Sequence, residues 1–295
     1  MKISAVLVVK DEEKNIQRCL TSLKDFADEI VVVDDGSTDE TVELAKKYTD
    51  KIFQHESKGY VEPARNFAIS KASGDWILII DADEELPQSL AKKLSQIANS
   101  DEFDCVLIPR KNIIFGKWIK NNKGWWPDYN PRFFKKGTVV WQDKIHSKPE
   151  ISGKEVRLEA EEELAIIHQN YKSVSDFINR MNRYTDIEAA ENTVDWRNFV
   201  KDQNDELLSR LFAREGYKDG VHGLFLGYLE SFYSTVVAAK IWEKKDFPDE
   251  NLDLHRLRKT IEKNYKDTEY WFLTAFGAET KNPLRKVLYK LLRKI

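Results

Sequence analysis

Short apolar runs alternate with helical patterns along the first 110 residues, and this alternation limits the possible folds more than any other feature of the chain. The runs that have strand length and are rich in Val and Ile are 3–9, 29–35, 51–53, 76–81 and 105–109. They are apolar on both faces, as buried parallel strands are. Between them apolar residues recur at helical spacing, as from Ile16 to Leu23. This pattern predicts an α/β fold with a mostly parallel sheet.

The pattern changes after about residue 110, and it predicts three segments. Residues 1–110 form the parallel α/β part. Residues 111–170 are rich in aromatic residues, Gly, Asn and Pro, which favours antiparallel ribbons and long loops. Residues 171–295 return to helical periodicity, so we expect a helical C-terminal region.

Composition excludes some classes of function. Of the 295 residues 33% are charged, yet the net charge is only -3, which gives no reason to expect a nucleic-acid partner. The two cysteines, Cys19 and Cys105, lie in apolar periodic segments, which predicts buried free thiols and suits a reducing cytoplasm. The apolar run at the N-terminus is short for a signal peptide and no transmembrane helix is expected.

Carboxylates gather where the predicted strands end, and ligands of an open parallel sheet bind at this edge. The sharpest case is "WILIIDADEEL", residues 76–86, where Asp81 and Asp83 follow a buried strand. Clustered carboxylates need a compensating cation, and Mg²⁺ or Mn²⁺ prefers carboxylate oxygens. We therefore expect Asp81 and Asp83 to hold a divalent metal, with Glu84 and Glu85 as first-turn acids of a helix that begins near Pro87.

Three ordered segments resemble a known family. They are "AVLVVKDEEKNIQRCLTSL", "ADEIVVVDDGSTDETVELA" and "ARNFAISKASGDWILIIDADEEL". In this order and spacing they resemble the inverting family 2 glycosyltransferases of GT-A fold, and most closely their lipopolysaccharide-core branch. That branch continues with G-W-x-P-D and R-x-F-x-x-G segments, matched here by "GWWPD" at 124–128 and "RFFKKG" at 132–137. The resemblance is strong to about residue 140 and loose beyond it.

The resemblance implies a nucleotide-sugar donor site in residues 1–110 and an acceptor-side half in 111–170. The residues that it assigns to the donor nucleotide and its diphosphate are Lys10, Glu12, Asp34, Asp35, Arg65 and Asp81. Asp83, helped by Asp81, would hold Mg²⁺ or Mn²⁺ against the diphosphate. Arg65 suits a phosphate contact because guanidinium binds phosphate through two parallel hydrogen bonds, although a surface arginine on a helix fits the sequence nearly as well.

The implied reaction is a single displacement, in which an acceptor hydroxyl attacks the anomeric carbon and a base takes its proton. Relatives of this branch often carry His-Glu after the R-x-F segment, whereas this chain reads "KIHSKP" with Ser147 in place of the Glu. Asp128 is our first candidate for the base because it lies in the acceptor-side half, and Asp143 is the second. His146 is a candidate neighbour of the metal or the phosphate.

Tryptophans are concentrated in the same half of the chain. Aromatic faces stack on sugar rings, so we expect one of Trp125 and Trp126 to contact the acceptor. Each of them fits the small core of a ribbon subdomain equally well.

The last residues, "KNPLRKVLYKLLRKI" at 281–295, form a basic amphipathic pattern with six Lys or Arg and no acid. Such a helix can lie on an anionic membrane surface. Periodicity alone is equally compatible with a terminal helix docked on the acidic body. The lipid-linked acceptors of the resembled family favour the membrane, and with it a peripheral location at the inner face of the cytoplasmic membrane.

The sequence therefore predicts a metal-dependent glycosyltransferase of cell-envelope glycan synthesis that acts on a saccharide or lipid-linked acceptor. Three alternatives stay open. A Mg²⁺-dependent phosphoacceptor domain would leave the Trp-rich and helical segments without a role. A nucleotidyltransferase would want a glycine-rich loop after the first strand, where "KDEEKN" has no glycine. A nucleotide-sugar binding protein without transfer activity is compatible with the missing His-Glu pair.

Overall fold

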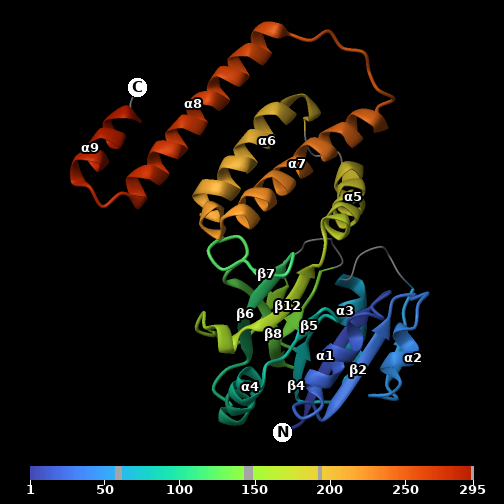
Figure 1. Cartoon of the computed structure of the whole chain (residues 1–295). Helices are drawn as coiled ribbons and strands as arrows, with labels where there is room; N and C mark the ends of the chain where they lie inside the picture. Colours follow the sequence, from blue (N-terminus) through green and yellow to red (C-terminus); the bar gives the residue numbers. More distant parts are fainter. Residues whose placement is uncertain (57–61, 143–148, 192–194, 294–295) are drawn as a thin grey trace. The chain divides into compact units, whose positions relative to one another are not determined.

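The computed structural model describes residues 1–56, 62–142, 149–191 and 195–293. Contacts between Cα atoms divide the chain into two compact units. Unit 1 comprises Met1–Ile113 and Trp125–Asn170, and unit 2 comprises Ile114–Gly124 and Tyr171–Ile295. Figure 1 labels the helices and strands of both units.

The strands are β1 (Ile3–Val9), β2 (Glu29–Asp34), β3 (Ile52–Gln54), β4 (Trp76–Ile79), β5 (Glu84–Glu85), β6 (Cys105–Ile114), β7 (Lys117–Trp118), β8 (Asp128–Lys135), β9 (Val139–Val140), β10 (Glu150–Ile151), β11 (Glu155–Arg157) and β12 (Ile166–Tyr171). The α-helices are α1 (Ile16–Leu23), α2 (Thr41–Ala45), α3 (Glu62–Lys71), α4 (Gln88–Ser100), α5 (Val174–Glu191), α6 (Phe199–Leu208), α7 (Val221–Lys244), α8 (Leu254–Glu279) and α9 (Pro283–Leu292). Short helical turns are η1 (Glu162–Leu164), η2 (Trp196–Asn198), η3 (Ser209–Ala213) and η4 (Gly216–Asp219).

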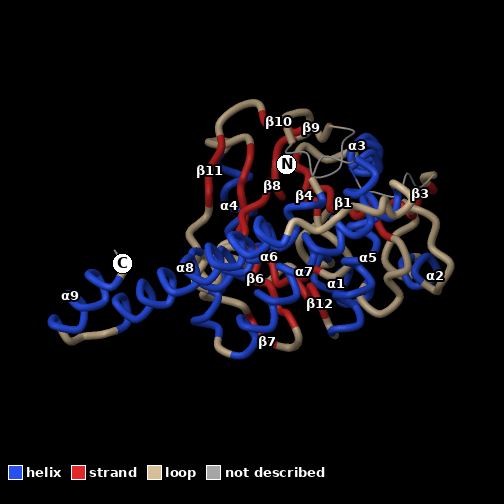
Figure 2. The backbone as a smooth tube through the Cα atoms, turned by 90° about the horizontal axis from the view of Figure 1, so that it is seen from above, coloured by secondary structure: helices blue, strands red, loops and turns tan. Residues whose placement is uncertain are grey.

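Unit 1 is built on one mixed sheet, in the strand order β3-β2-β1-β4-β8-β6-β12-β5. The strands β3, β2, β1 and β4 are parallel, whereas β8 pairs antiparallel with both β4 and β6. The separate β9–β10 ladder is antiparallel and lies next to β8 (Figure 2). The predicted α/β class, with a parallel part followed by an antiparallel ribbon and a helical C-terminal region, is confirmed.

Both faces of the parallel strands are buried, because side chains alternate between two apolar clusters. Leu7 and Leu78 face a cluster that includes α1 and α4, whereas Val6 and Ile77 face a second cluster that includes α3. Two covered faces explain why these strands read as continuous apolar runs rather than as alternating ones. The carboxyl ends of β1, β2 and β4 consequently lie side by side at one edge (Figure 1).

Glu29, at the start of β2, is a buried carboxylate at the opposite edge of the sheet, and its side chain is 3% exposed. It accepts hydrogen bonds from Ser73 N (2.7 Å) and Ser73 Oγ (2.8 Å), and others from Ser4 Oγ and Lys51 Nζ. Burial by itself would raise the pKa of Glu29, but these bonds outweigh it and lower the pKa from 4.5 to about 2. The carboxylate therefore joins β1, β2 and the segment before β4.

We expect Glu29→Gln to lower the free energy of unfolding by about 1–3 kcal/mol at neutral pH, because an amide replaces an acceptor of charged hydrogen bonds. A group with a lowered folded-state pKa stabilises above its unfolded pKa and loses that effect as the pH falls. The difference between Glu29→Gln and wild type should shrink between pH 4.5 and about 2. Urea unfolding over this range measures it, with the exposed Glu43→Gln as control; a constant difference would contradict the assignment.

Unit 2 is helical, and a close approach of two glycines shapes it. A Cβ atom on Gly223, in the first turn of α7, would lie 1.8 Å from the carbonyl oxygen of Gly216 in η4. Only glycine allows α7 to start so close to this turn. The helix α7 then packs against α5 and α6, and α8 packs against α6.

The segment Ile114–Gly124 is fixed within unit 2 by the buried side chain of Asp219, which is 2% exposed. Asp219 Oδ2 accepts hydrogen bonds from the backbone N–H groups of Asn121 (3.2 Å) and Asn122 (2.9 Å), and its carbonyl oxygen accepts one from Lys117 Nζ (2.7 Å). Lys123 N donates to Arg214 O (2.8 Å). The segment therefore satisfies a carboxylate that would otherwise be buried without partners.

Two other expectations concern the whole chain. Cys19 and Cys105 are buried free thiols, as predicted, and burial raises the pKa of Cys105 to about 12. Within the described residues, no helix combines the length and apolar character that crossing a bilayer requires.

Candidate active site

The two acids at the end of β2 are buried and fixed by local hydrogen bonds. Asp34 Oδ1 accepts from Ser37 N (3.0 Å), and Asp35 Oδ1 lies 2.8 Å from His55 Nδ1. Gly36, which follows the two acids, has a φ of +89° and turns the chain sharply after the strand. His55, which follows β3, is a partner that the sequence analysis did not identify.

The loop after β1 is tied to the loop after β2. Asp11 adopts a φ of +54°, and its Oδ1 accepts from Thr38 N (2.7 Å) while Asp11 N donates to Ser37 Oγ (3.0 Å). Glu12 Oε2 accepts from Asn15 Nδ2 (2.6 Å), and Lys10 is exposed. These hydrogen bonds join the loop that carries Lys10 and Glu12 to the loop that carries Asp34 and Asp35, at the edge where the four residues were predicted to lie.

Asp81, the first acid after β4, is held by two arginines. Its Oδ2 accepts from Arg132 Nη2 (2.6 Å), and its Oδ1 lies 3.4 Å from Arg65 Nη2. Burial by itself would raise the pKa of Asp81, but the guanidinium groups of Arg132 and Arg65 outweigh it and hold the pKa well below its usual range. Arg65 also lies over the ring of Trp141, 5.9 Å from its centroid. Arg65 is therefore held at the site and is not a solvated surface side chain.

The expectation that Glu84 and Glu85 begin a helix is wrong. They form strand β5, which pairs antiparallel with β12, and α4 begins only at Gln88. Glu84 is fully buried, and it accepts from Arg132 Nη2 (2.9 Å) and from Asp81 N (2.9 Å). Two acids before a proline resemble a helix start, but the buried guanidinium of Arg132 requires a carboxylate here.

Asp83 points toward His168 on β12, a residue that the sequence analysis missed. Asp83 Oδ2 lies 3.4 Å from His168 Nε2, and both residues are 7% exposed. On the other side of the ring, His168 Nδ1 lies 2.7 Å from Asn112 Oδ1. The chain gives little signal for this histidine, because it stands alone in the strand sequence "IIHQNY" without a motif around it.

The hydrogen bonds of Asn112 determine which atoms of His168 and Asp83 face each other. Asn112 Nδ2 donates to the carbonyl oxygen of Trp125 (2.9 Å), so Asn112 Oδ1 faces the histidine and Nδ1 of His168 carries the proton. In the neutral ring the lone pair of Nε2 then faces Asp83 Oδ2. A cation between these two acceptors, either a proton or a metal ion, would offset their repulsion at 3.4 Å.

This pair fits a divalent metal. Two ligand atoms that are each about 2.0–2.2 Å from one ion lie roughly 3.0–3.5 Å apart. A metal-bound histidine usually donates its other N–H to an oxygen, as His168 does to Asn112. In the described part of the chain, no three or more His, Cys, Asp or Glu side chains converge on one point. Asp83 and His168 would therefore leave other coordination positions to water or substrate.

Asp128, at the start of β8, is connected to the same network. Arg110 Nε donates to Asp128 Oδ2 (2.8 Å), Arg110 Nη2 pairs with the same oxygen, and Asn112 Nδ2 lies 3.4 Å from it. The Asp128 side chain is 25% exposed, and Trp125 and Trp126 beside it are half-buried. Asn112 thus joins the candidate metal pair to the candidate base.

Two residues predicted for the site, Asp143 and His146, lie outside the described residues. The roles assigned to them stay predictions. The residues that the structure adds to the site are His55, Arg110, Asn112, Arg132 and His168.

Comparison with known proteins covers most residues of this site but not His168, which lies beyond the matched stretch. The model of the family described as "Glycosyl transferase family 2" matches residues 4–150. Residues 4–150 form a glycosyltransferase family 2 domain. The mixed sheet of unit 1, which β11 and β12 extend beyond residue 150, has a GT-A-like fold, as expected from the resemblance.

Individual curated relatives match part of the chain. An uncharacterized glycosyltransferase of Rickettsia typhi is 43% identical over 103 residues, which are 35% of this chain and 35% of that protein. The glycosyltransferase SunS of Bacillus subtilis is 33% identical over 153 residues, which are 50% of this chain and 34% of that protein. The matches thus span about a third of the length of these curated relatives.

Two solved structures are also similar to the chain. The structure of S. aureus TarS 1-349 in complex with UDP covers 86% of this chain and 94% of its own, with 17% identity and a TM-score of 0.46. Glucosyl-3-phosphoglycerate synthase from Mycobacterium tuberculosis, in complex with Mn²⁺ and UDP-glucose, covers 39% of this chain and 44% of its own, with 26% identity and a TM-score of 0.32.

We expect His168→Gln and Asp83→Asn each to weaken Mn²⁺ binding by about tenfold or more, because each removes one of two ligands. Asn112→Ala should weaken it by roughly 10- to 100-fold, since this amide fixes the histidine tautomer. Calorimetric titration of Mn²⁺ into the protein measures the effect without any substrate. His222→Gln, a histidine of unit 2, is the control. If His168→Gln bound Mn²⁺ like wild type, the Asp83–His168 pair would be a structural ion pair.

Proposed function

We propose that the chain is a metal-dependent inverting glycosyltransferase that moves a sugar from a nucleotide-sugar donor to a saccharide or lipid-linked acceptor. The observation that carries this proposal is the pair of acceptor atoms that face each other 3.4 Å apart, Asp83 Oδ2 in the family 2 domain and His168 Nε2 on β12 beyond it. A metal ion bound by this pair would lie at the same edge of the sheet as Asp34 and Asp35, because β2, β1 and β4 are parallel neighbours. Such an edge is where an open α/β sheet binds a nucleotide.

Residues at the strand ends would bind different parts of the nucleotide-sugar donor. Asp34 or Asp35 binds the base and ribose, with Lys10 and Glu12 nearby. Arg65 binds the diphosphate, since a guanidinium can form two parallel hydrogen bonds to phosphate oxygens. Both oxygens of Asp81 face arginine side chains. Asp81 therefore holds Arg65 in place, and it does not form the metal site by itself.

Asp83 and His168 would hold Mg²⁺ or Mn²⁺, with Asp81 close by. The ion, when bound, acts as a Lewis acid that offsets negative charge on the departing diphosphate. Asn112 keeps Nδ1 of His168 protonated, which leaves Nε2 as the ligand atom.

Asp128 is the proposed base of the transfer step. The acceptor oxygen forms a bond to the anomeric carbon, the bond from that carbon to the diphosphate breaks, and the hydroxyl proton passes to the carboxylate. Arg110 orients Asp128 through Oδ2, and Oδ1 faces the amide of Asn130 (3.2 Å). Trp125 or Trp126 offers an aromatic face on which the acceptor sugar can stack.

Two acceptor-side segments and the basic tail support a class of acceptor and a location. A lipopolysaccharide-core or similar cell-envelope acceptor follows from the resemblance of the "GWWPD" and "RFFKKG" segments. The basic amphipathic helix α9 supports a peripheral position at the inner face of the cytoplasmic membrane. Its apolar side chains, including Leu284 and Leu291, are 79% and 57% exposed.

We expect Asp128→Asn to lower the rate of transfer by roughly 10²- to 10⁴-fold while nucleotide affinity stays unchanged, because the amide cannot take a proton. Single-turnover transfer measures the rate, and calorimetry with the nucleotide measures the affinity. Asp143→Asn is the matched variant for the second candidate. Retained turnover in Asp128→Asn together with lost turnover in Asp143→Asn would assign the base to Asp143.

The donor site is tested by a thermal-shift panel of UDP, GDP, ADP and CMP, with and without Mn²⁺. A ligand at 100 times its Kd stabilises by about 2.7 kcal/mol, so one nucleotide should raise the Tm by several degrees and only with the metal. Asp83→Asn should remove the metal-dependent part of the shift. If no nucleotide shifts the Tm of the wild type, the donor-site assignment fails.

A further inference from the structure

The helix α9 packs on α8 with its polar side. Tyr289 contacts Phe276 and Gly277, and Arg293 Nη1 donates to Thr274 Oγ1 (3.1 Å). Both views show α9 folded back beside the C-terminal part of α8 (Figures 1 and 2). The two residues that face α8, Tyr289 and Arg293, are one helical turn apart.

The opposite side of α9 is an exposed apolar row. The row consists of Leu284, Val287, Leu288, Leu291 and Leu292, which are 41–79% exposed. These positions recur at helical spacing and avoid Tyr289 and Arg293. The row therefore points away from α8.

Three lysines of α8 lie on the side to which α9 is attached. Lys259, Lys263 and Lys266 recur three to four residues apart, and Tyr270, Thr274 and Gly277 continue the same spacing. Arg293 lies over the ring of Tyr270 and bonds Thr274, so the continuation of the lysine row is the surface that α9 covers. One side of α8 thus carries the three lysines in its N-terminal half and is covered by α9 in its C-terminal half.

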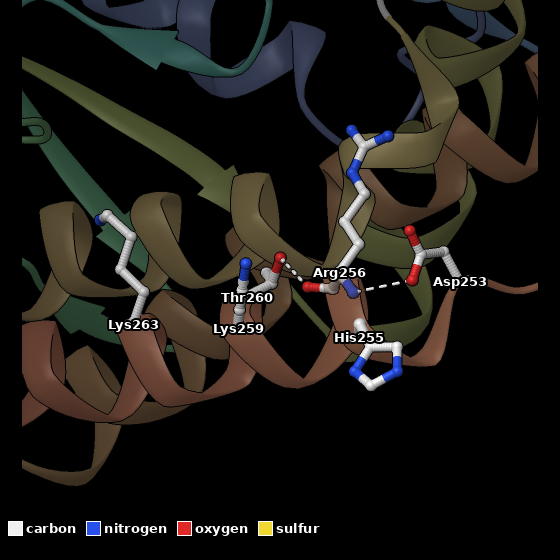
Figure 3. Close-up of a pocket in the computed structure, with 6 residues that line it drawn as sticks. All are labelled: Asp253, His255, Arg256, Lys259, Thr260 and Lys263. Carbon is white, nitrogen blue, oxygen red and sulfur yellow. Dashed lines mark hydrogen bonds between the residues drawn. The ribbon is translucent and has the colours of Figure 1, made fainter.

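The lysine row borders a shallow hollow of about 480 Å³, lined by Asp253, His255, Arg256, Lys259, Thr260 and Lys263. Arg256, Lys259 and Lys263 extend from the same side of α8 (Figure 3). Lys263 pairs with Asp267, whereas Lys259 and Lys266 have no ion pair or hydrogen bond to any described residue. Free ammonium groups at this surface are suited to an external anion.

We propose that α8 and α9 form one docking surface for an anionic lipid bilayer, in which α9 inserts its apolar row and the lysine row of α8 contacts lipid phosphates. This surface extends the membrane contact of the proposed function from α9 to α8. It rests on the proposed function in one respect, because a lipid-linked acceptor would place the protein at a membrane. An interfacial helix buries its apolar face about 5–10 Å deep. Packed helices lie about 8–10 Å apart, so the lysines of α8 reach the layer of phosphate groups above that depth.

Charge complementarity supports this occupant. Residues 254–295 hold eleven Lys or Arg and four Asp or Glu, a net charge of +7, which leaves -10 for the rest of the chain. An anionic surface attracts the α8–α9 segment and repels the remainder. Of the four acids of the segment, Asp267 pairs with Lys263, whereas among the described residues Glu262, Glu269 and Glu279 form no ion pair with a lysine of the row.

A second exposed apolar row lies on another face of α8. It consists of Leu254, Ile261, Tyr265 and Phe272, which are 43–69% exposed. The spacing of seven and four residues places it on a different side of the helix from Lys259, Lys263 and Lys266. This row serves as an internal control, because the proposal gives it no part in lipid binding.

The test uses flotation of the full chain with vesicles of phosphatidylcholine, alone or mixed with phosphatidylglycerol. We expect binding only to the mixed vesicles, weakening as the ionic strength rises. The variant Lys259→Glu/Lys263→Glu/Lys266→Glu should bind roughly 100-fold or more weakly, and Leu288→Asp/Leu291→Asp should abolish binding. The charge-matched control Lys24→Glu/Lys47→Glu/Lys92→Glu, in unit 1, should bind within about threefold of wild type.

Three results would overturn the proposal. One is equal binding by the two triple lysine variants. Another is a loss of binding on Ile261→Asp/Tyr265→Asp with no loss on the α8 lysine variant, which would move the contact to the other face. The third is a dimer in sedimentation that Leu288→Asp/Leu291→Asp dissolves, which would assign the apolar row to a second copy. The nucleotide-dependent Tm shift of each variant reports separately on the donor site, so failure of one proposal does not imply failure of the other.

Discussion

The buried guanidinium of Arg132 is the constraint on which the arrangement of the site depends. Arg132 is 4% exposed, and the carboxylates of Asp81 and Glu84 both bind its Nη2. Burial by itself would lower the pKa of Arg132, but these carboxylates outweigh it and raise the pKa above its usual value. A buried cation without them would cost several kcal/mol. The turn after β4 must therefore lie against β8, and this fixes where Asp83 points.

From Asp83 a chain of side-chain contacts leads across the antiparallel half of the sheet. His168 connects Asp83 to Asn112, and Asn112 connects both to Asp128 and to the backbone of Trp125. The residues proposed for the metal and for the acceptor hydroxyl thus share one amide. This amide is fully buried, and a change at Asn112 would alter the tautomer of His168 and the position of Asp128 together.

Much of the parallel half could be predicted from the sequence because its signals are local. The apolar runs of β1, β2 and β4 are continuous, and the acids that follow them stand next to them in the chain. Glu84 was misassigned because its partner, Arg132, lies 48 residues away and has no periodic signal. His168 was missed for the same reason, since its role arises only when β12 pairs with β5 and brings it to Asp83. Residue type and spacing cannot show such long-range pairs.

The path of the chain between the two units has a practical consequence. Unit 1 is interrupted by Ile114–Gly124, which packs with Asp219 and Arg214 in unit 2, so the backbone passes between the units three times. A fragment that stops at Asn170 would leave this segment without its partners, and a fragment that starts at Tyr171 would leave the carboxylate of Asp219 buried and unsatisfied. A chimera that transplants the C-terminal helices onto another catalytic domain would have to bring residues 114–124 with them as a second graft.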